Sequence, residues 1–261
     1  MGYTIALAGK GGTGKTTTAA LVVDYLKNNK AGSILAIDAD PNANLNQTLG
    51  IELNGTVVGI LDKVADSKLD GMPAGMTKDR YIEYEVQRSL SEGDGFDLLA
   101  MGRPEGPGCY CYANNVLRGI IDKLAKTYDF VVIDNEAGME HLSRRITRKI
   151  DLFLIVSDFS RIGVRSAGRI SELASEMDLK IGVRHLIINM ATAAGADPLK
   201  TEIEKTGLDL AGVIPFDEGI EDLSLAGQPI RERLADLKSG AFYKDMLDKI
   251  LAKAIAETKA K

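Results

Sequence analysis

The chain has 261 residues, of which 26% are charged and 45% hydrophobic, so it is not a collagen-like, coiled-coil or disordered protein. A net charge of −5 and a pI near 5.3 provide no general attraction for phosphate backbones, and we expect no nucleic-acid partner. No apolar run approaches the roughly 20 residues that span a bilayer, and the first residues do not read as a signal peptide. We therefore expect a cytoplasmic protein without stable membrane association. Only two cysteines occur, which excludes a disulfide scaffold.

Short runs rich in Val, Ile and Leu alternate with amphipathic stretches, which predicts parallel strands joined by crossover helices. The expected strands are Thr4–Ala8, Ile34–Ile37, Phe96–Met101, Phe130–Ile133, Leu152–Val156, His185–Ile188 and Leu210–Ile214. The expected helices are Lys15–Asn28, Asn114–Thr127, His141–Lys149, Val164–Met177, Pro198–Thr206 and Phe242–Ala256. The pattern predicts one α/β domain over residues 1–261, with a doubly wound, mostly parallel sheet flanked by helices. Residues 66–94 contain several Gly and Pro breakers and are expected to form an irregular insertion within it.

A phosphate-binding loop is predicted directly after the first strand. Residues 9–17 read Gly-Lys-Gly-Gly-Thr-Gly-Lys-Thr-Thr and fit the pattern G-x-x-x-x-G-K-[ST] between a strand and a helix. In such a loop the backbone N–H groups form an anion nest, and the helix adds the positive end of its dipole. Lys15 is expected to reach the outer phosphates of ATP, and Thr16 to bind Mg²⁺. The other expected contacts are Gly11, Gly12, Thr13, Gly14 and Thr17.

A second lysine, Lys10, stands directly after the first glycine and makes the loop a deviant Walker A motif, K-G-G-x-G-K-[ST]. With it the sequence resembles the MinD, ParA and nitrogenase iron-protein superfamily of P-loop NTPases. The resemblance implies an ATP-dependent homodimer in which Lys10 reaches the phosphates of the partner's nucleotide, as an arginine finger does in other NTPases. The alternative for Lys10 is a solvated loop lysine.

Carboxylates follow two of the expected strands. The resemblance puts Asp40 in the role of orienting the attacking water, with Asp38 nearby, whereas the plainer alternative is an Asp that caps the turn before Pro41. Asp134 ends a Val- and Ile-rich strand and is expected to hold Mg²⁺ in the Walker B position. Gly138 resembles the switch glycine whose N–H meets the γ-phosphate.

Contacts with the adenine base are expected from two later strand ends. Asn189 follows the strand His185–Ile188, and Pro215, Phe216 and Asp217 follow the last expected strand. These positions resemble the base-binding positions of the superfamily. An Asn side chain offers both a donor and an acceptor, so it can pair with both kinds of group on a purine edge.

Both cysteines lie in one segment, Gly-Pro-Gly-Cys-Tyr-Cys-Tyr, at residues 106–112. Alternate positions on an extended backbone direct Cys109 and Cys111 to the same side. Two thiolates do not complete a metal site, but a two-fold axis at this loop would bring four together. We expect a metal site shared by a dimer. The alternative is a pair of small apolar residues packed near Tyr110 and Tyr112.

The cysteine segment, together with Asp-Asn-Glu-Ala-Gly-Met-Glu-His at residues 134–141, closely resembles the CooC and AcsF family of nickel-insertion ATPases. The resemblance implies Ni²⁺ as the cargo, with Zn²⁺ able to bind in vitro, and ATP with Mg²⁺ as cofactors. It also implies apo carbon monoxide dehydrogenase or apo acetyl-CoA synthase as the client.

Two other functions stay open at this point. One is a positioning ATPase like MinD or ParA, which would adsorb to lipid or DNA and tolerate loss of the cysteines. The other is an electron donor similar to the nitrogenase iron protein, with an iron–sulfur cluster held by two chains. The close spacing of Cys109 and Cys111 disfavours this second alternative.

Overall fold

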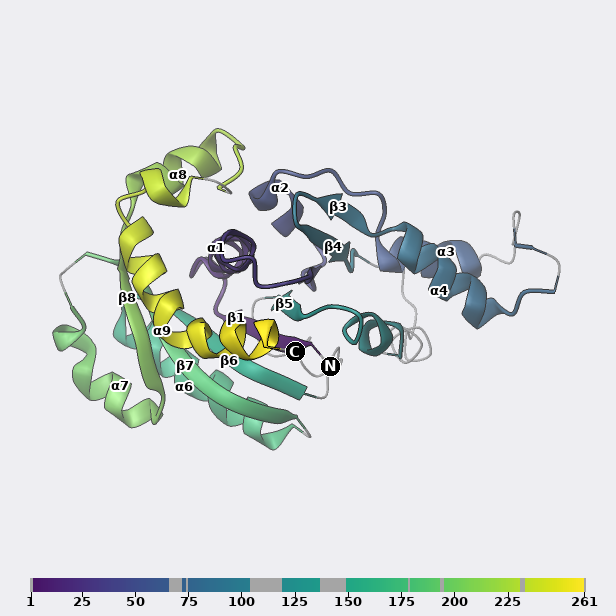
Figure 1. Cartoon of the computed structure of the whole chain (residues 1–261). Coiled ribbons are helices and arrows are strands. Elements are labelled where there is room, and N and C mark those ends of the chain that lie inside the picture. The colour runs from purple at the N-terminus through teal and green to yellow at the C-terminus, as the bar shows by residue number, and fades with distance from the viewer. Residues whose placement is uncertain are drawn as a thin grey trace.

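The structure is a computed structural model that describes residues 2–65, 72–73, 75–103, 119–136, 149–177, 179–192, 195–230 and 233–260. Within these residues the chain forms one eight-stranded sheet in the order β3-β4-β2-β5-β1-β6-β7-β8 (Figure 1). The strands are β1 (Tyr3–Gly9), β2 (Ile34–Asp38), β3 (Ser91–Gly93), β4 (Phe96–Ala100), β5 (Phe130–Asp134), β6 (Lys149–Asp158), β7 (Lys180–Ala191) and β8 (Asp209–Pro215). Only the β3–β4 pair is antiparallel, so the predicted mostly parallel α/β sheet is confirmed.

Helices cover both faces of the sheet, and each face has its own hydrophobic core. Strands β1, β2 and β5 are buried along almost their whole length, as expected for parallel strands between two helical layers. One face carries α1 (Lys15–Asn28), α2 (Leu45–Leu49), α8 (Glu218–Leu225) and α9 (Gly240–Lys259). The other carries α3 (Val57–Ala65), α4 (Lys78–Arg88), α6 (Arg161–Glu176), α7 (Lys200–Thr206) and the helical residues 119–124. Two short 3₁₀ turns are η2 (Asp197–Leu199) and η3 (Leu234–Asp236).

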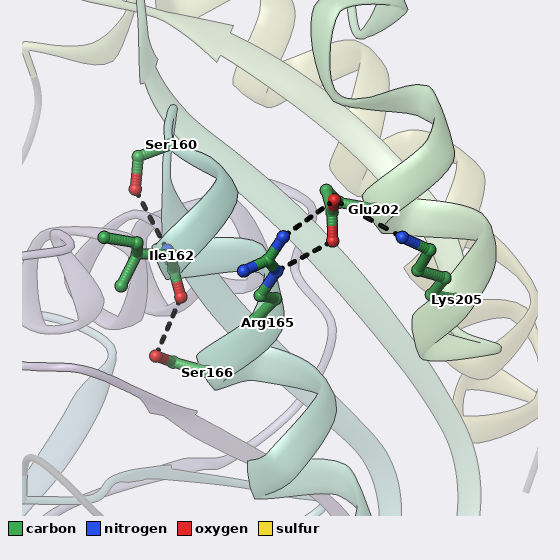
Figure 2. A network of polar contacts seen from close by, with 7 residues as sticks. Ser160, Ile162, Arg165, Ser166, Glu202 and Lys205 are labelled. Atoms are coloured by element: carbon green, nitrogen blue, oxygen red, sulfur yellow. Dashed lines mark hydrogen bonds and ion pairs between the residues drawn. The ribbon is translucent and has the colours of Figure 1, made fainter.

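A polar network links α6 to α7 (Figure 2). Ser160 caps α6, because its hydroxyl accepts the N–H of Gly163 at 2.9 Å. One turn further along α6, Arg165 donates two hydrogen bonds to the carboxylate of Glu202 on α7, at 2.9 and 3.1 Å. Lys205 approaches the same carboxylate at 3.6 Å. The Arg165–Glu202 pair thus joins the two helices by two hydrogen bonds.

Several sequence predictions need correction. Residues 66–94 were expected to be irregular, but they contain α4, whose N-cap is Thr77, and β3, which pairs with β4. Lys149, expected at the end of a helix, is the first residue of β6. Residues 141–148 of that expected helix lie outside the described residues, as do 114–118 of the helix expected at 114–127. No helix in the described part of the chain is long and apolar enough to cross a membrane.

Candidate nucleotide site

The carboxyl ends of the parallel strands meet at one edge of the sheet, and the described residues of the predicted nucleotide site lie along this edge. Asp38 and Asp134 are register partners at the ends of β2 and β5. The phosphate-binding loop leaves β1, which lies between β5 and β6, and Asn189 lies near the end of β7. An open α/β sheet binds its ligands at this edge.

The loop between β1 and α1 is closed by its own side chains. The hydroxyl of Thr13 donates to the carbonyl of Lys10 at 2.9 Å, and Nζ of Lys15 donates to the same carbonyl at 3.1 Å. Gly14 has a left-handed φ of 86°, and a Cβ there would lie 2.3 Å from Nδ2 of Asn189. Only glycine fits that position. Lys10 itself is exposed, whereas Lys15 is buried.

Burial and nearby charges act in opposite directions on Lys15. Burial lowers the pKa of Lys15, while the carboxylates of Asp134, Asp40 and Glu136 favour its charged form. A phosphate group bound at the loop would add further negative charge beside the ammonium group. The surroundings of Lys15 are therefore consistent with its predicted role at the outer phosphates.

Asp134 has the features of a magnesium ligand. It is 1% exposed, one of its oxygens is hydrogen-bonded to the side chain of Thr16, and Oδ1 is buried without a partner. Burial, together with the neighbouring charge of Asp38, raises the pKa of Asp134 to about 7. A buried carboxylate oxygen without a hydrogen bond, next to a hydroxyl group, is suited to a hard cation. Thr16 and Asp134 therefore fit the predicted Mg²⁺.

Asp38 and Asp40 shape the segment that follows β2. The two oxygens of Asp38 accept the N–H groups of Asp40 at 3.0 Å and Leu45 at 2.8 Å. Burial raises the pKa of Asp38 to about 6. Oδ1 of Asp40 accepts the N–H of Asn42 at 2.8 Å, so Asp40 does form the turn that was the plainer alternative. These bonds use Oδ1 of Asp40 and leave Oδ2 for other interactions.

A cavity of about 190 Å³ lies beside the loop. Asn189, at its wall, is 6% exposed and donates from Nδ2 to the carbonyl of Thr13 at 3.0 Å. Met190 has a positive φ of 55°, an uncommon backbone conformation that is often found at binding sites. The cavity is lined by Gly12, Gly14, Thr17, Asn189, Met190, Pro215, Phe216, Asp217, Ile220 and Glu221. It therefore brings together all four residues predicted to contact adenine.

These four residues differ in what they can offer a base. Phe216 is 45% exposed and presents its ring at the cavity. Both oxygens of Asp217 are engaged, with the N–H groups of Gly219 at 2.9 Å and Ser239 at 2.7 Å. Asp217 therefore caps α8 and shapes the cavity. Ile220 and Glu221 also line the cavity but were not predicted from the sequence, although they lie about one helical turn after this cap.

The predicted thiolate pair and switch glycine, Cys109, Cys111 and Gly138, lie outside the described residues. The residues that lead to the cysteines are described. The N–H of Met101 donates to the carbonyl of Asp38 at 2.9 Å, and the N–H of Val58 donates to the carbonyl of Met101 at 2.9 Å. Within the described ranges, no three His, Cys, Asp or Glu side chains form a group that could hold a metal ion.

Comparisons with known proteins agree with this geometry. A family model described as the CobQ/CobB/MinD/ParA nucleotide binding domain matches residues 4–230. An uncharacterized ATP-binding protein of Methanocaldococcus jannaschii is 43% identical over 227 residues, which cover 87% of this chain and 89% of that protein. The carbon monoxide dehydrogenase accessory protein CooC of Rhodospirillum rubrum is 28% identical over 233 residues, which cover 85% and 87% of the two chains.

Among solved structures, the septum site-determining protein MinD of Pyrococcus horikoshii, complexed with Mg-ADP, has a TM-score of 0.67 to this chain. The match has 19% sequence identity and covers 98% of this chain and all of MinD. At this identity the likeness shows the fold alone.

Proposed function

The chain belongs to the CobQ/CobB/MinD/ParA nucleotide-binding family and is an ATPase, and we propose that it uses ATP to deliver Ni²⁺ to apo carbon monoxide dehydrogenase or apo acetyl-CoA synthase. The observation that carries the proposal is the cysteine pair. Cys109 and Cys111 are the only cysteines in the chain, are separated by one residue, and follow β4 in the sequence. The relative named as a carbon monoxide dehydrogenase accessory protein supports this choice of client. In this proposal the chain works in the cytoplasm as a homodimer.

The residues on the phosphate side of the site have separate roles in the proposed ATP hydrolysis. The loop N–H groups and Lys15 bind the phosphates, and Thr16 and Asp134 hold Mg²⁺. Mg²⁺, when bound, neutralises charge on the phosphate oxygens. Asp40 orients the attacking water with its remaining oxygen, Oδ2. Lys10, which is exposed, reaches across a two-fold interface to the partner's nucleotide.

Main-chain hydrogen bonds support a coupling between this step and the cysteines. The carbonyl of Asp38 accepts the N–H of Met101, and the side chain of Asp38 holds the N–H groups of Asp40 and Leu45. Asp38 thus contacts both the segment that responds to the nucleotide and the segment that leads to Cys109. When hydrolysis shifts the segment around Asp40, the hydrogen bond between Asp38 and Met101 transmits the shift to the start of the cysteine segment. The affinity of the cysteines for Ni²⁺ then changes.

Nickel binding tests the proposal directly. We would measure anaerobic binding of Ni²⁺ by equilibrium dialysis, with and without MgATP. The expected result is about one ion per two chains, dependent on nucleotide and lost in Cys109→Ala/Cys111→Ala. Imidazole also binds nickel, so His141→Ala serves as the control and is expected to keep full binding. Nickel binding that survives loss of both cysteines would contradict the thiolate site.

A second candidate function is a positioning ATPase like MinD, which membership of the CobQ/CobB/MinD/ParA family favours. This function predicts ATP-dependent adsorption of the chain to a surface. Sedimentation with anionic lipid vesicles or with DNA, in the presence of MgATP, separates the two candidates. Nucleotide-dependent sedimentation that is unchanged in Cys109→Ala/Cys111→Ala would favour positioning over nickel delivery.

A further inference from the structure

The hydroxyl of Tyr243 joins two side chains that hold the phosphate-binding loop. Tyr243 lies on α9 and is 0% exposed. Its hydroxyl donates to Oδ1 of Asn189 at 3.3 Å and also lies against the side-chain hydroxyl of Thr18, on the first turn of α1. Thr18 is itself 0% exposed. The three side chains therefore form a buried polar network beneath the loop.

The other ends of this network lie on two consecutive carbonyl groups of the loop. Nδ2 of Asn189 donates to the carbonyl of Thr13 at 3.0 Å. The hydroxyl of Thr18 donates to the carbonyl of Gly14 at 2.8 Å, and the main-chain N–H of Thr18 donates to the same carbonyl at 2.9 Å. Asn189 and Thr18 thus restrain adjacent peptide groups, and the hydroxyl of Tyr243 lies against both side chains.

The donors and acceptors of the network allow only one arrangement of Asn189. A carbonyl can only accept, so the NH₂ group of Asn189 must face Thr13. Its oxygen is then directed at Tyr243, whose hydroxyl must donate. Burial raises the pKa of Tyr243 to about 12, so the hydroxyl keeps its proton at neutral pH. Tyr243 therefore holds the Asn189 amide in the orientation that Thr13 requires.

Peptide geometry links these carbonyls to the phosphate-binding groups. In a planar trans peptide, the carbonyl of one residue and the N–H of the next point in opposite directions. When the carbonyls of Thr13 and Gly14 are held toward Asn189 and Thr18, the N–H groups of Gly14 and Lys15 must point away from them. Inward N–H groups of this kind make the anion nest of a phosphate-binding loop.

We propose that Tyr243 is a positioning residue for nucleotide binding: by its hydrogen bond to Asn189 and its contact with Thr18, its buried hydroxyl orients the peptide groups that present the N–H of Gly14 and Lys15 to the phosphates. The C-terminal helix α9 is thereby part of the nucleotide site, although it is remote from the loop in sequence. The proposal rests on ATP binding by this site and is independent of nickel delivery.

Tyr243→Phe tests this role, and the chain offers a matched control. Tyr25 on α1 is 5% exposed, and its hydroxyl donates to Asp248 on α9 at 2.5 Å. Tyr25→Phe therefore removes one hydrogen bond from the same helix pair without touching the loop. We expect Tyr243→Phe to weaken MgADP binding, measured by calorimetry, about three- to tenfold, and Tyr25→Phe by less than about twofold. Thermal unfolding without nucleotide measures the purely structural cost of each change.

A double-mutant cycle with Thr18→Val examines the connection itself, because Val keeps the shape of Thr and removes the hydroxyl. If the two hydroxyls act on the loop together, the losses of ADP affinity in Tyr243→Phe and Thr18→Val are not additive. Additive losses would contradict the proposal. A second result would also contradict it. In that result Tyr243→Phe binds ADP as tightly as the original chain, and its thermal stability falls by the same amount as that of Tyr25→Phe. Neither measurement uses nickel or a client, so failure here leaves nickel delivery untouched.

Discussion

Asp38 and Asp134 are the same residue type, pair in register at the ends of neighbouring strands and are each 1% exposed, yet their surroundings differ. Both oxygens of Asp38 accept backbone N–H groups, whereas Oδ1 of Asp134 has no partner. A carboxylate whose two oxygens both accept backbone N–H groups organises the loop around it, and one with an unused buried oxygen is suited to a cation. Position at a strand end alone therefore does not define a metal ligand. The remaining bonding capacity of each oxygen separates the two roles.

The largest effect is expected from Asp134→Ala. Loss of a ligand to Mg²⁺ should lower the rate of ATP hydrolysis about 100-fold or more, since a bound metal contributes several kcal/mol to charge stabilisation. The free energy of unfolding of the metal-free protein should change little, because removal of a buried oxygen without a partner offsets the loss of the hydrogen bond with Thr16. Phosphate release at saturating MgATP and urea denaturation measure the two quantities. Hydrolysis at the original rate would remove Asp134 from the magnesium site.

At Asp38, the register partner of Asp134, substitution is expected to lower the unfolding free energy clearly. Asp38→Ala leaves the buried N–H groups of Asp40 and Leu45 without their acceptor and should cost about 1–3 kcal/mol of unfolding free energy. Urea denaturation of Asp38→Ala and Asp134→Ala under the same metal-free conditions makes the comparison. Equal stability of the two variants would mean that the backbone bonds of Asp38 do not hold the loop.

The pKa values predict a pH dependence of magnesium binding. Burial raises the pKa of Asp134 from 3.8 to about 7 and that of Asp38 to about 6. The folded metal-free protein then binds more protons than the unfolded chain, so its stability falls as pH rises from about 4 to about 7. Mg²⁺ binds the ionised carboxylate, and its affinity should be about tenfold higher at pH 8 than at pH 6.

Thermal unfolding with and without Mg²⁺ at these two pH values measures the effect, and Asp134→Ala should abolish it. A stabilisation by Mg²⁺ that is the same at pH 6 and pH 8 in the original chain would contradict an Asp134 ligand with a raised pKa.

The smallest effect is expected at a helix cap away from Asp38 and Asp134. Ser160→Ala removes the hydroxyl that accepts the N–H of Gly163 and should lower the unfolding free energy by about 1 kcal/mol. The affinity for ADP should stay unchanged. Urea denaturation of this variant measures its unfolding free energy, and calorimetry measures its affinity for ADP. The two values serve as a reference for the Asp38 and Asp134 variants. A clear loss of ADP affinity would instead connect α6 to the nucleotide site.

Local chemistry made the phosphate side of the site predictable. The loop at residues 9–17 is one contiguous segment between a strand and a helix, and α1 has the predicted bounds Lys15–Asn28. Asp134 was correctly placed at the end of a short Val- and Ile-rich strand, while its role as a magnesium ligand stays a prediction. The helix α4 was missed because it is strongly polar and buries only Ile82 and Val86, which gives a weak helical pattern.

Contacts between distant residues could not be predicted in the same way. The hydrogen bond from Tyr243 to Asn189 joins positions 54 residues apart, and nothing in the local sequence of α9 indicates it. The two backbone partners of Asp38 depend on how the chain folds back from Asp40 to Leu45. The metal role of Cys109 and Cys111 stays a prediction, since these residues lie outside the described ranges.

Nickel transfer to a client tests the central claim most directly. Protein loaded with radioactive nickel is mixed anaerobically with apo carbon monoxide dehydrogenase, with and without MgATP, and both the nickel in the client and its activity are measured. We predict transfer that requires ATP and fails with Lys15→Ala and with Cys109→Ala/Cys111→Ala. Activation of the client at the normal rate by the Lys15→Ala protein would contradict the coupling of ATP hydrolysis to nickel delivery.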